Sequence, residues 1–185
     1  MPYKVIRVPS PNDDDDENRD RWKRHLELDR AIISIITDNE IGEEEKIRML
    51  QESIADKTFN ADAFDNEYEA SALEIASEKG YADIVEFLLD NNAAVDMNQN
   101  TLTPLMRAAT VKIAALLLTR GADVNAEDAL NRTPIMYACM DKRYDVAELL
   151  VNSGANMEAE DEAGKSAQSY YSDMTEQRAN VNFYI

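Results

Sequence analysis

The sequence contains few of the residues that cross-linking and catalysis require. A single cysteine, Cys139, excludes an intramolecular disulfide and a multi-cysteine zinc site. His25 is the only histidine, and the five glycines form neither a Gly-rich phosphate loop nor a G-x-S-x-G nucleophile elbow. We therefore expect no enzyme activity and no cofactor.

Long apolar runs are also absent. One of the most apolar stretches, "RAATVKIAALLL" (residues 107–118), is shorter than the roughly 18–20 residues of a membrane-spanning helix, and it contains Arg107 and Lys112. The N-terminal residues include no apolar stretch long enough for a signal peptide. We expect no membrane segment, and we expect a cytoplasmic protein, or one in the host cytosol if it is a secreted effector.

Positive charge is scarce. The chain has 19 Lys and Arg against 37 Asp and Glu, so its formal net charge at pH 7 is −18. Such a chain repels nucleic acids and anionic membranes, which argues against both as ligands. We expect another protein as the partner, for which a basic surface would suit the charge, and we expect the chain to be a monomer.

Two acidic segments are candidate metal sites by composition alone. In "DDDDENRD", an EF-hand loop that starts at Asp14 would place Arg19 where the loop needs glycine and His25 where it needs the bidentate glutamate. We instead interpret residues 1–20 as a flexible acidic arm. The second segment, "EAEDE" (residues 158–162), is expected in a solvent-exposed turn, so we predict no metal site.

Residues 21–65 have the apolar spacing of a helical hairpin. Ile32, Ile35 and Ile36 continue a stripe that starts at Trp22, and a second stripe follows in "EEEKIRMLQESIAD". The glutamates that begin this second segment would lie in the first turn of a helix, where the helix dipole favours negative charge. Each helix has one apolar face, which needs a neighbour.

Residues 66–185 supply that neighbour because they repeat. The segments "SALEIASEKGYADIVEFLLDNNAAVD", "TPLMRAATVKIAALLLTRGADVN", "TPIMYACMDKRYDVAELLVNSGANME" and "SAQSYYSDM" align, and their starts are 32, 30 and 33 residues apart. This pattern resembles the ankyrin-repeat family, whose unit of about 33 residues is a turn followed by two antiparallel helices. The resemblance implies an all-α solenoid of three repeats and a truncated C-terminal repeat, with the N-terminal hairpin as a cap or as a degenerate repeat.

Several positions have mechanical roles in this family. Thr103 and Thr133 are expected to cap the first helices, each followed by a proline at the first helical position. Gly121 and Gly154 follow the second helices, where a left-handed residue is required, and Asn92 takes this place in the first repeat. Cys139 is expected to be a buried structural residue, and Met106 and Met136 to pack between repeats.

The run "RAATVKIAALLL" belongs to the second repeat, where residues 109–115 correspond to residues 77–86 of the first repeat and are three residues fewer. We expect "RAAT" to end one helix and "VKIAALLL" to belong to the next, with the inter-helix turn shortened by three residues. We therefore expect a local change in curvature or a notch in the surface at this repeat.

The resemblance implies a module that binds a protein partner through its turns and its concave face, as adaptors, inhibitors and secreted bacterial effectors do. The alternative is an acidic stoichiometric inhibitor, or immunity-type protein, that masks a basic enzyme or nucleic-acid-binding protein. Carried over by position, the predicted partner-binding residues are Tyr68, Gln99, Asn100, Leu102, Arg107, Leu130, Arg132, Tyr137, Lys165 and Tyr170.

Overall fold

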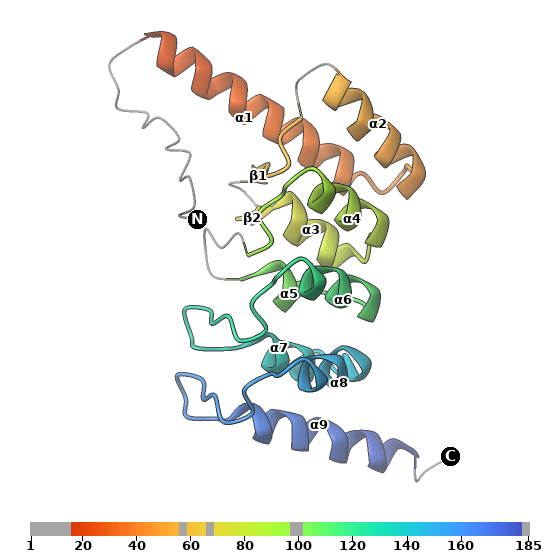
Figure 1. The fold of residues 1–185 in the computed structure, drawn as a ribbon, viewed down its shortest axis with the longest axis vertical. Helices are drawn as coiled ribbons and strands as arrows, with labels where there is room; N and C mark the ends of the chain where they lie inside the picture. Colours follow the sequence, from red (N-terminus) through yellow and green to blue (C-terminus); the bar gives the residue numbers. More distant parts are fainter. Residues whose placement is uncertain (1–15, 56–58, 66–68, 97–101, 183–185) are drawn as a thin grey trace.

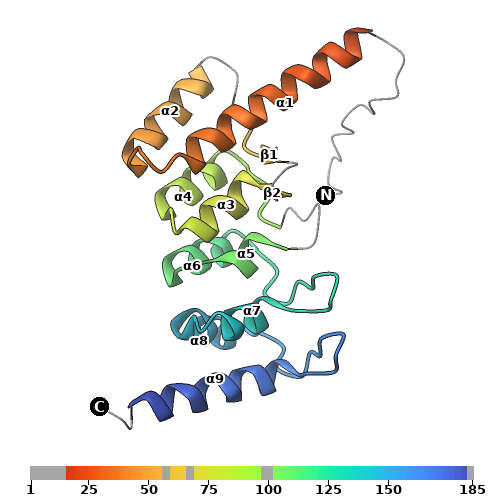
Figure 2. The same cartoon turned by 180° about the vertical axis from the view of Figure 1, so that it is seen from behind.

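The computed structural model of the chain describes residues 16–55, 59–65, 69–96 and 102–182, and these residues form a stack of helical pairs (Figure 1). Consecutive first helices contact one another along the stack, and so do consecutive second helices (Figure 2). Each layer therefore buries its apolar face against its neighbours. This arrangement confirms the predicted all-α solenoid.

The first helices of the pairs are α1 (Asp16–Thr37), α3 (Ala72–Lys79), α5 (Pro104–Arg107) and α7 (Pro134–Met140). The second helices are α2 (Glu43–Ala55), α4 (Ala82–Asp90), α6 (Val111–Thr119) and α8 (Tyr144–Asn152). The single helix α9 (Ala167–Asn182) ends the stack, as the truncated fourth unit predicts (Figure 1). Strand β1 (Phe64–Asp65) pairs antiparallel with strand β2 (Ala70–Ser71) just before α3.

The predicted N-terminal hairpin is present as α1 and α2. Its two helices meet through buried side chains such as Ile36 and Leu50. Lys46 is also fully buried; its Nζ donates to the Ile36 carbonyl at 3.0 Å and lies 4.2 Å from the centre of the Tyr81 ring. Because α1 begins at Asp16, residues 16–20 of the predicted arm are helical, which is incompatible with an EF-hand loop there. Residues 1–15 lie outside the described residues.

The caps of the first helices agree with the predictions in part. Thr103 precedes α5, and its hydroxyl accepts from the Met106 amide at 3.4 Å. At α3, the amide of Ser71 donates to the Glu74 carboxylate at 2.6 Å, so this glutamate completes a capping box. The prediction for the Thr133 hydroxyl was wrong: Thr133 precedes α7, but its hydroxyl is buried without a partner.

The left-handed residues after the second helices are confirmed. Gly121 and Gly154 both have φ 92°, and Asn92 has φ 67°. Only glycine adopts this conformation freely, and asparagine tolerates it better than most residues do. The chain can therefore turn back at the same point in each repeat and enter the next unit.

The second repeat confirms two helices within "RAATVKIAALLL", but the position of the deletion was predicted wrongly. Residues 108–110 separate α5 from α6, and 141–143 separate α7 from α8, so the inter-helix turn keeps its length. The missing residues come from the first helix: α5 has 4 residues, against 8 in α3 and 7 in α7. Sequence alignment located the gap but could not assign it to the helix or to the turn.

Arg143, from the turn between α7 and α8, compensates for the missing helical turn. Its Nη1 donates to the Ala108 carbonyl at 2.6 Å and its Nη2 to the Met106 carbonyl at 2.8 Å. On the opposite side, the Ala109 amide donates to the Ser77 carbonyl of α3 at 3.0 Å. Backbone groups at the end of a short helix otherwise lack partners, so both neighbouring repeats complete α5. Beside Arg143, residues of the two inter-helix turns line an open hollow of about 450 Å³, at the site of the expected notch.

The core runs the length of the stack. Leu117 is completely inaccessible. Met106 and Met136 are almost completely inaccessible too, which confirms their predicted packing roles. Cys139 is likewise buried, at 4% exposure, and burial raises the pKa of its thiol to about 11. Among the described residues, none of the helices combines the length and hydropathy that crossing a bilayer requires.

Candidate functional site

Two loops project from the stack, one before α7 and one before α9 (Figure 1). We call residues 123–133 the α7 finger and residues 156–166 the α9 finger. At the base of the α7 finger lies Asp128, whose side chain is 2% exposed. Its carboxylate accepts from the Leu130 and Arg132 amides, both at 2.8 Å, and from the Tyr137 hydroxyl at 2.5 Å. This one side chain therefore holds the finger closed and ties it to α7.

The α9 finger has the same construction 33 residues later. The carboxylate of Asp161 accepts from the Ala163 amide at 3.0 Å, from the Lys165 amide at 2.8 Å and from the Tyr170 hydroxyl at 2.8 Å. A basic residue follows the aspartate by four positions in both fingers, and a tyrosine follows it by nine. We call each set of aspartate, basic residue and tyrosine a brace.

The basic residue of each brace covers the tyrosine. The Arg132 guanidinium lies 5.0 Å from the centre of the Tyr137 ring, and the Lys165 Nζ lies 4.0 Å from that of Tyr170. Arg132 also donates through Nε to Asp128 at 3.0 Å, while Lys165 pairs with Asp173 at 2.7 Å. Both cations are therefore engaged within the chain, which fixes the orientation of the two rings.

The charges of the braces are consistent with this geometry. Burial raises the pKa of Asp128, but the hydrogen bonds from Tyr137 and the two amides outweigh it, so the pKa lies below its ordinary value. Burial, together with the bond to Asp128, raises the pKa of Tyr137 to about 12. In the α9 finger, backbone donation from Lys165 and the bond from Tyr170 lower the pKa of Asp161. Both aspartates are thus held in the ionised form.

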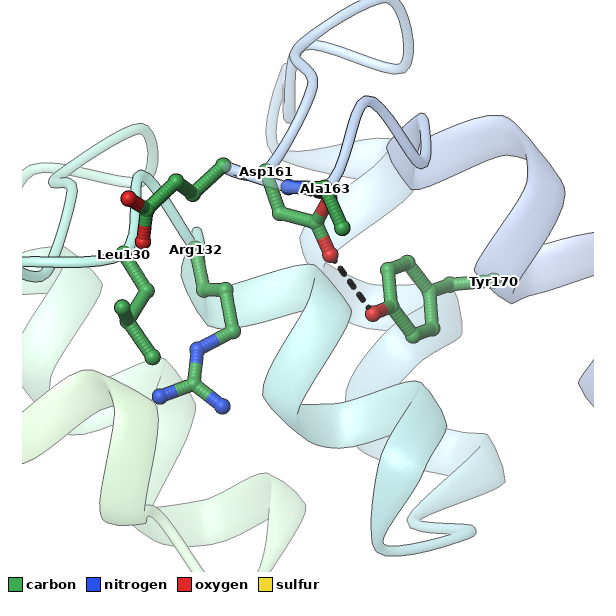
Figure 3. A pocket seen from close by; sticks show the side chains of 6 residues that line it. Leu130, Arg132, Asp161, Ala163 and Tyr170 are labelled. Atoms are coloured by element: carbon green, nitrogen blue, oxygen red, sulfur yellow. Dashed lines mark hydrogen bonds between the residues drawn. The ribbon is translucent and has the colours of Figure 1, made fainter.

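Between the tips of the fingers lies an open hollow of about 430 Å³ (Figure 3). Its apolar lining comes from Leu130, Ala163 and the Tyr170 ring, and its polar lining from Arg132, Asp161 and Glu162. The Glu162 amide donates to the Leu130 carbonyl at 2.9 Å and so joins the two fingers. Leu130 is 42% exposed beside this hollow, which leaves apolar surface in contact with water.

The structure brings half of the predicted partner-binding residues together. Leu130 and Arg132 line the hollow with Tyr170, and Tyr137 and Lys165 belong to the braces. Of the other five, Leu102 and Arg107 do not join this group. Leu102 is half-buried before α5, and Arg107 forms a 2.6 Å ion pair with Glu78 of α3. The remaining three, Tyr68, Gln99 and Asn100, lie outside the described residues. The contact of each residue with a partner stays a prediction.

Sequence reasoning missed the two aspartates that organise the fingers. A signal was available, because Asp128 and Asp161 occupy the same position relative to the tyrosines in successive units. Asp161 was interpreted as part of a solvent-exposed acidic turn, and Asp128 was not singled out. Within the part of the chain that the structure describes, no group of three or more His, Cys, Asp or Glu side chains is placed to hold a metal ion.

Comparison with known proteins agrees with the architecture. A family model described as ankyrin repeats (3 copies) matches residues 39–128 and 93–161, and so starts within the hairpin. The glycerophosphocholine phosphodiesterase GDE1 of Candida albicans is 36% identical over 81 residues, covering 41% of this chain and 7% of that protein. The human ankyrin repeat and KH domain-containing protein 1 is 45% identical over 60 residues, covering 30% of this chain and 2% of that protein.

The chain thus matches only a small part of the length of either relative. Ankyrin repeats are protein–protein interaction modules, and the paired helices, left-handed turns and projecting fingers described above are those of such an array. The chain therefore belongs to the ankyrin-repeat family.

Proposed function

We propose that the chain is a non-enzymatic binding module that holds a protein partner against the α7 and α9 fingers and the adjoining first helices. The observation that carries this proposal is Leu130, which is 42% exposed at the tip of a braced finger. Leu130 lines the hollow together with Ala163 and Tyr170, so its side chain belongs to a shared apolar surface with a polar rim, and such a surface favours a partner contact.

The braces support the proposal energetically. Binding costs free energy when loops and side chains must be ordered, and a surface that is ordered beforehand avoids most of this cost. The Asp128 and Asp161 braces order both fingers in the free chain, together with Tyr137 and Tyr170 on the first helices. Tyrosine and arginine are also the residues that most often dominate the energy of protein interfaces.

Three biological roles suit such a module. An adaptor, an inhibitor and a secreted bacterial effector can all use such a module, in the cytoplasm or in the cytosol of a host. A monomer suits each role, because the array would present its binding surface without a second copy.

A second candidate function follows from the charge. An acidic inhibitor or immunity-type protein would mask a basic enzyme or nucleic-acid-binding protein, and the net charge of −18 would speed its association with such a target. Salt distinguishes the two functions. Charge-driven association should weaken strongly between low and several hundred millimolar salt, whereas contact through Leu130 should persist.

The test is capture of a partner from native lysate, followed by binding measurements with purified components. Leu130→Asp should weaken binding at least about tenfold, because a desolvated contact of more than 1.4 kcal/mol is lost. Met49→Asp is the matched control, since Met49 is 36% exposed on α2, near the opposite end of the stack (Figure 1). Equal affinity of both variants for the partner would contradict the proposal.

A further inference from the structure

The tips of the two fingers, which face the hollow between them, differ in the size of one side chain. Leu130 and Ala163 are 33 residues apart and occupy equivalent tip positions. Each is followed by a left-handed residue, Asn131 with φ 56° and Gly164 with φ 75°. The α9 finger therefore carries a methyl group where the α7 finger carries an isobutyl group. In Figure 3, Ala163 and Leu130 lie on opposite sides of the hollow, with the Tyr170 ring on the Ala163 side.

The charge around this hollow is strongly one-sided. The two fingers contain seven acidic residues and two basic ones. Both basic residues already have carboxylate partners, Arg132 on Asp128 and Lys165 on Asp173. In the described structure, four exposed glutamates of the fingers have no ion pair and no hydrogen bond to their carboxylates; they are Glu127, Glu158, Glu160 and Glu162. Of these, Glu162 lines the hollow itself.

This combination selects one kind of occupant. The apolar lining can take up an aliphatic or aromatic side chain, while an acidic neighbour of that side chain would meet Glu162 and the other unpaired glutamates. Lysine or arginine neighbours would instead find carboxylates that are not already neutralised, and opposite charges at the rim of an interface favour association and fix its register. An acidic peptide would have to displace the aspartates from both cations.

We propose that the hollow receives one large apolar side chain, from leucine, methionine or phenylalanine, carried by a basic segment of the protein partner. The inference rests on the proposed function and names the chemistry of the segment that the fingers contact. Ala163 supplies the space, Leu130 and Tyr170 supply apolar contact, and Glu162 selects the flanking positive charge.

Three hexapeptides test this chemistry. One has a single leucine among five lysines and arginines, the second has alanine in place of this leucine, and the third has the leucine among five glutamates. Each is titrated into the full chain labelled with ¹⁵N. The leucine–lysine peptide should shift the amide resonances of Leu130, Ala163 and Tyr170, and it should bind several-fold more tightly than the alanine peptide. The glutamate peptide should not bind there.

Variants of the hollow separate space from charge. Ala163→Leu fills the space without a change of charge, and Glu162→Lys reverses the charge at the rim. Each variant should bind the leucine–lysine peptide at least about fivefold more weakly than the wild type does, and a factor of five corresponds to about 1 kcal/mol of binding free energy. Glu176→Lys on α9 is the matched control, because Glu176 is exposed and lies outside the fingers. The affinity of this variant for the leucine–lysine peptide should change less than about twofold. Circular dichroism checks that each variant keeps its helix content.

Several results would overturn the inference. These are the absence of shifts with the leucine–lysine peptide, equal binding of the alanine peptide, tighter binding of the glutamate peptide, and unchanged affinity of Ala163→Leu. A failure of the inference about the hollow can be distinguished from a failure of the proposed binding function. If a captured partner is lost with Leu130→Asp but retained equally by Ala163→Leu and Glu162→Lys, the fingers bind a partner without this hollow.

Discussion

Replacing Arg143 by methionine keeps the aliphatic part of the side chain and removes the guanidinium that completes α5. Two carbonyl oxygens, those of Met106 and Ala108, lose donors at 2.8 and 2.6 Å. The side chain of Arg143 is only 14% exposed, so water cannot fully replace it. An acceptor left without its donor costs about 1–3 kcal/mol. The loss is partly offset, because the Nε of Arg143 is buried without a partner. We expect the variant to lose about 2–4 kcal/mol of unfolding free energy.

Urea denaturation followed by circular dichroism measures this loss. Arg120→Met is the matched control, because Arg120 forms an exposed ion pair with Asp90 at 2.6 Å, and such surface pairs contribute about 0–1 kcal/mol. The loss of unfolding free energy in Arg143→Lys should lie between those of Arg120→Met and Arg143→Met, since one ammonium group cannot reach both carbonyls as the planar guanidinium does. A loss below about 0.5 kcal/mol, or one equal to that of Arg120→Met, would refute the role of Arg143 in completing α5.

Two further predictions concern the core and the α7 brace. Leu117→Ala should reduce the unfolding free energy by about 2–5 kcal/mol, because Leu117 is completely buried; a change below about 1 kcal/mol in urea melts would contradict its place in the core. Asp128→Asn should destabilise the chain by about 1–3 kcal/mol at pH 7, where the wild-type carboxylate accepts its hydrogen bonds. The pKa of Asp128 is lower in the folded chain than its ordinary value of 3.8. The carboxylate therefore contributes fully to the unfolding free energy above pH 3.8, and this contribution is lost as the pH falls through the lowered pKa. Melts at several pH values should therefore show the difference between wild type and variant shrinking in acid; a constant difference would argue against an ionised Asp128 in the brace.

The fold was predictable because its signals are local and repeated. Each left-handed position depends on one residue, such as Gly121 or Asn92, and each helix on one apolar stripe. The role of Glu74 as a cap partner and the empty hydroxyl of Thr133 were not predictable in the same way. The pairing of the Glu74 carboxylate with the Ser71 amide requires a long polar side chain three positions into the helix. The local sequence does not distinguish Thr133 from Thr103, because a methionine occupies this position in both helices, yet only the Thr103 hydroxyl has a partner.

The candidate site was predictable only by position. Family resemblance placed Leu130, Arg132 and Tyr137 near the finger, but periodicity contains no information on which partner a charged side chain chooses. Arg132 could have faced solvent; instead it lies on Tyr137 and Asp128, because the finger closes around that carboxylate. Such pairings depend on the loop conformation, which a one-residue change in length or one left-handed residue alters.

The short helix α5 also limits how this array can evolve or be engineered. Repeat proteins grow by duplication and tolerate exchange of units because each repeat contacts only its neighbours through similar surfaces. Here the second repeat requires an arginine from whichever unit follows it. The equivalent position of the first repeat holds Tyr81, which has no cation to offer the Met106 and Ala108 carbonyls. Separating the second repeat from the third removes these two hydrogen bonds, so we expect insertion, deletion or transplantation to be tolerated best when the two repeats move together.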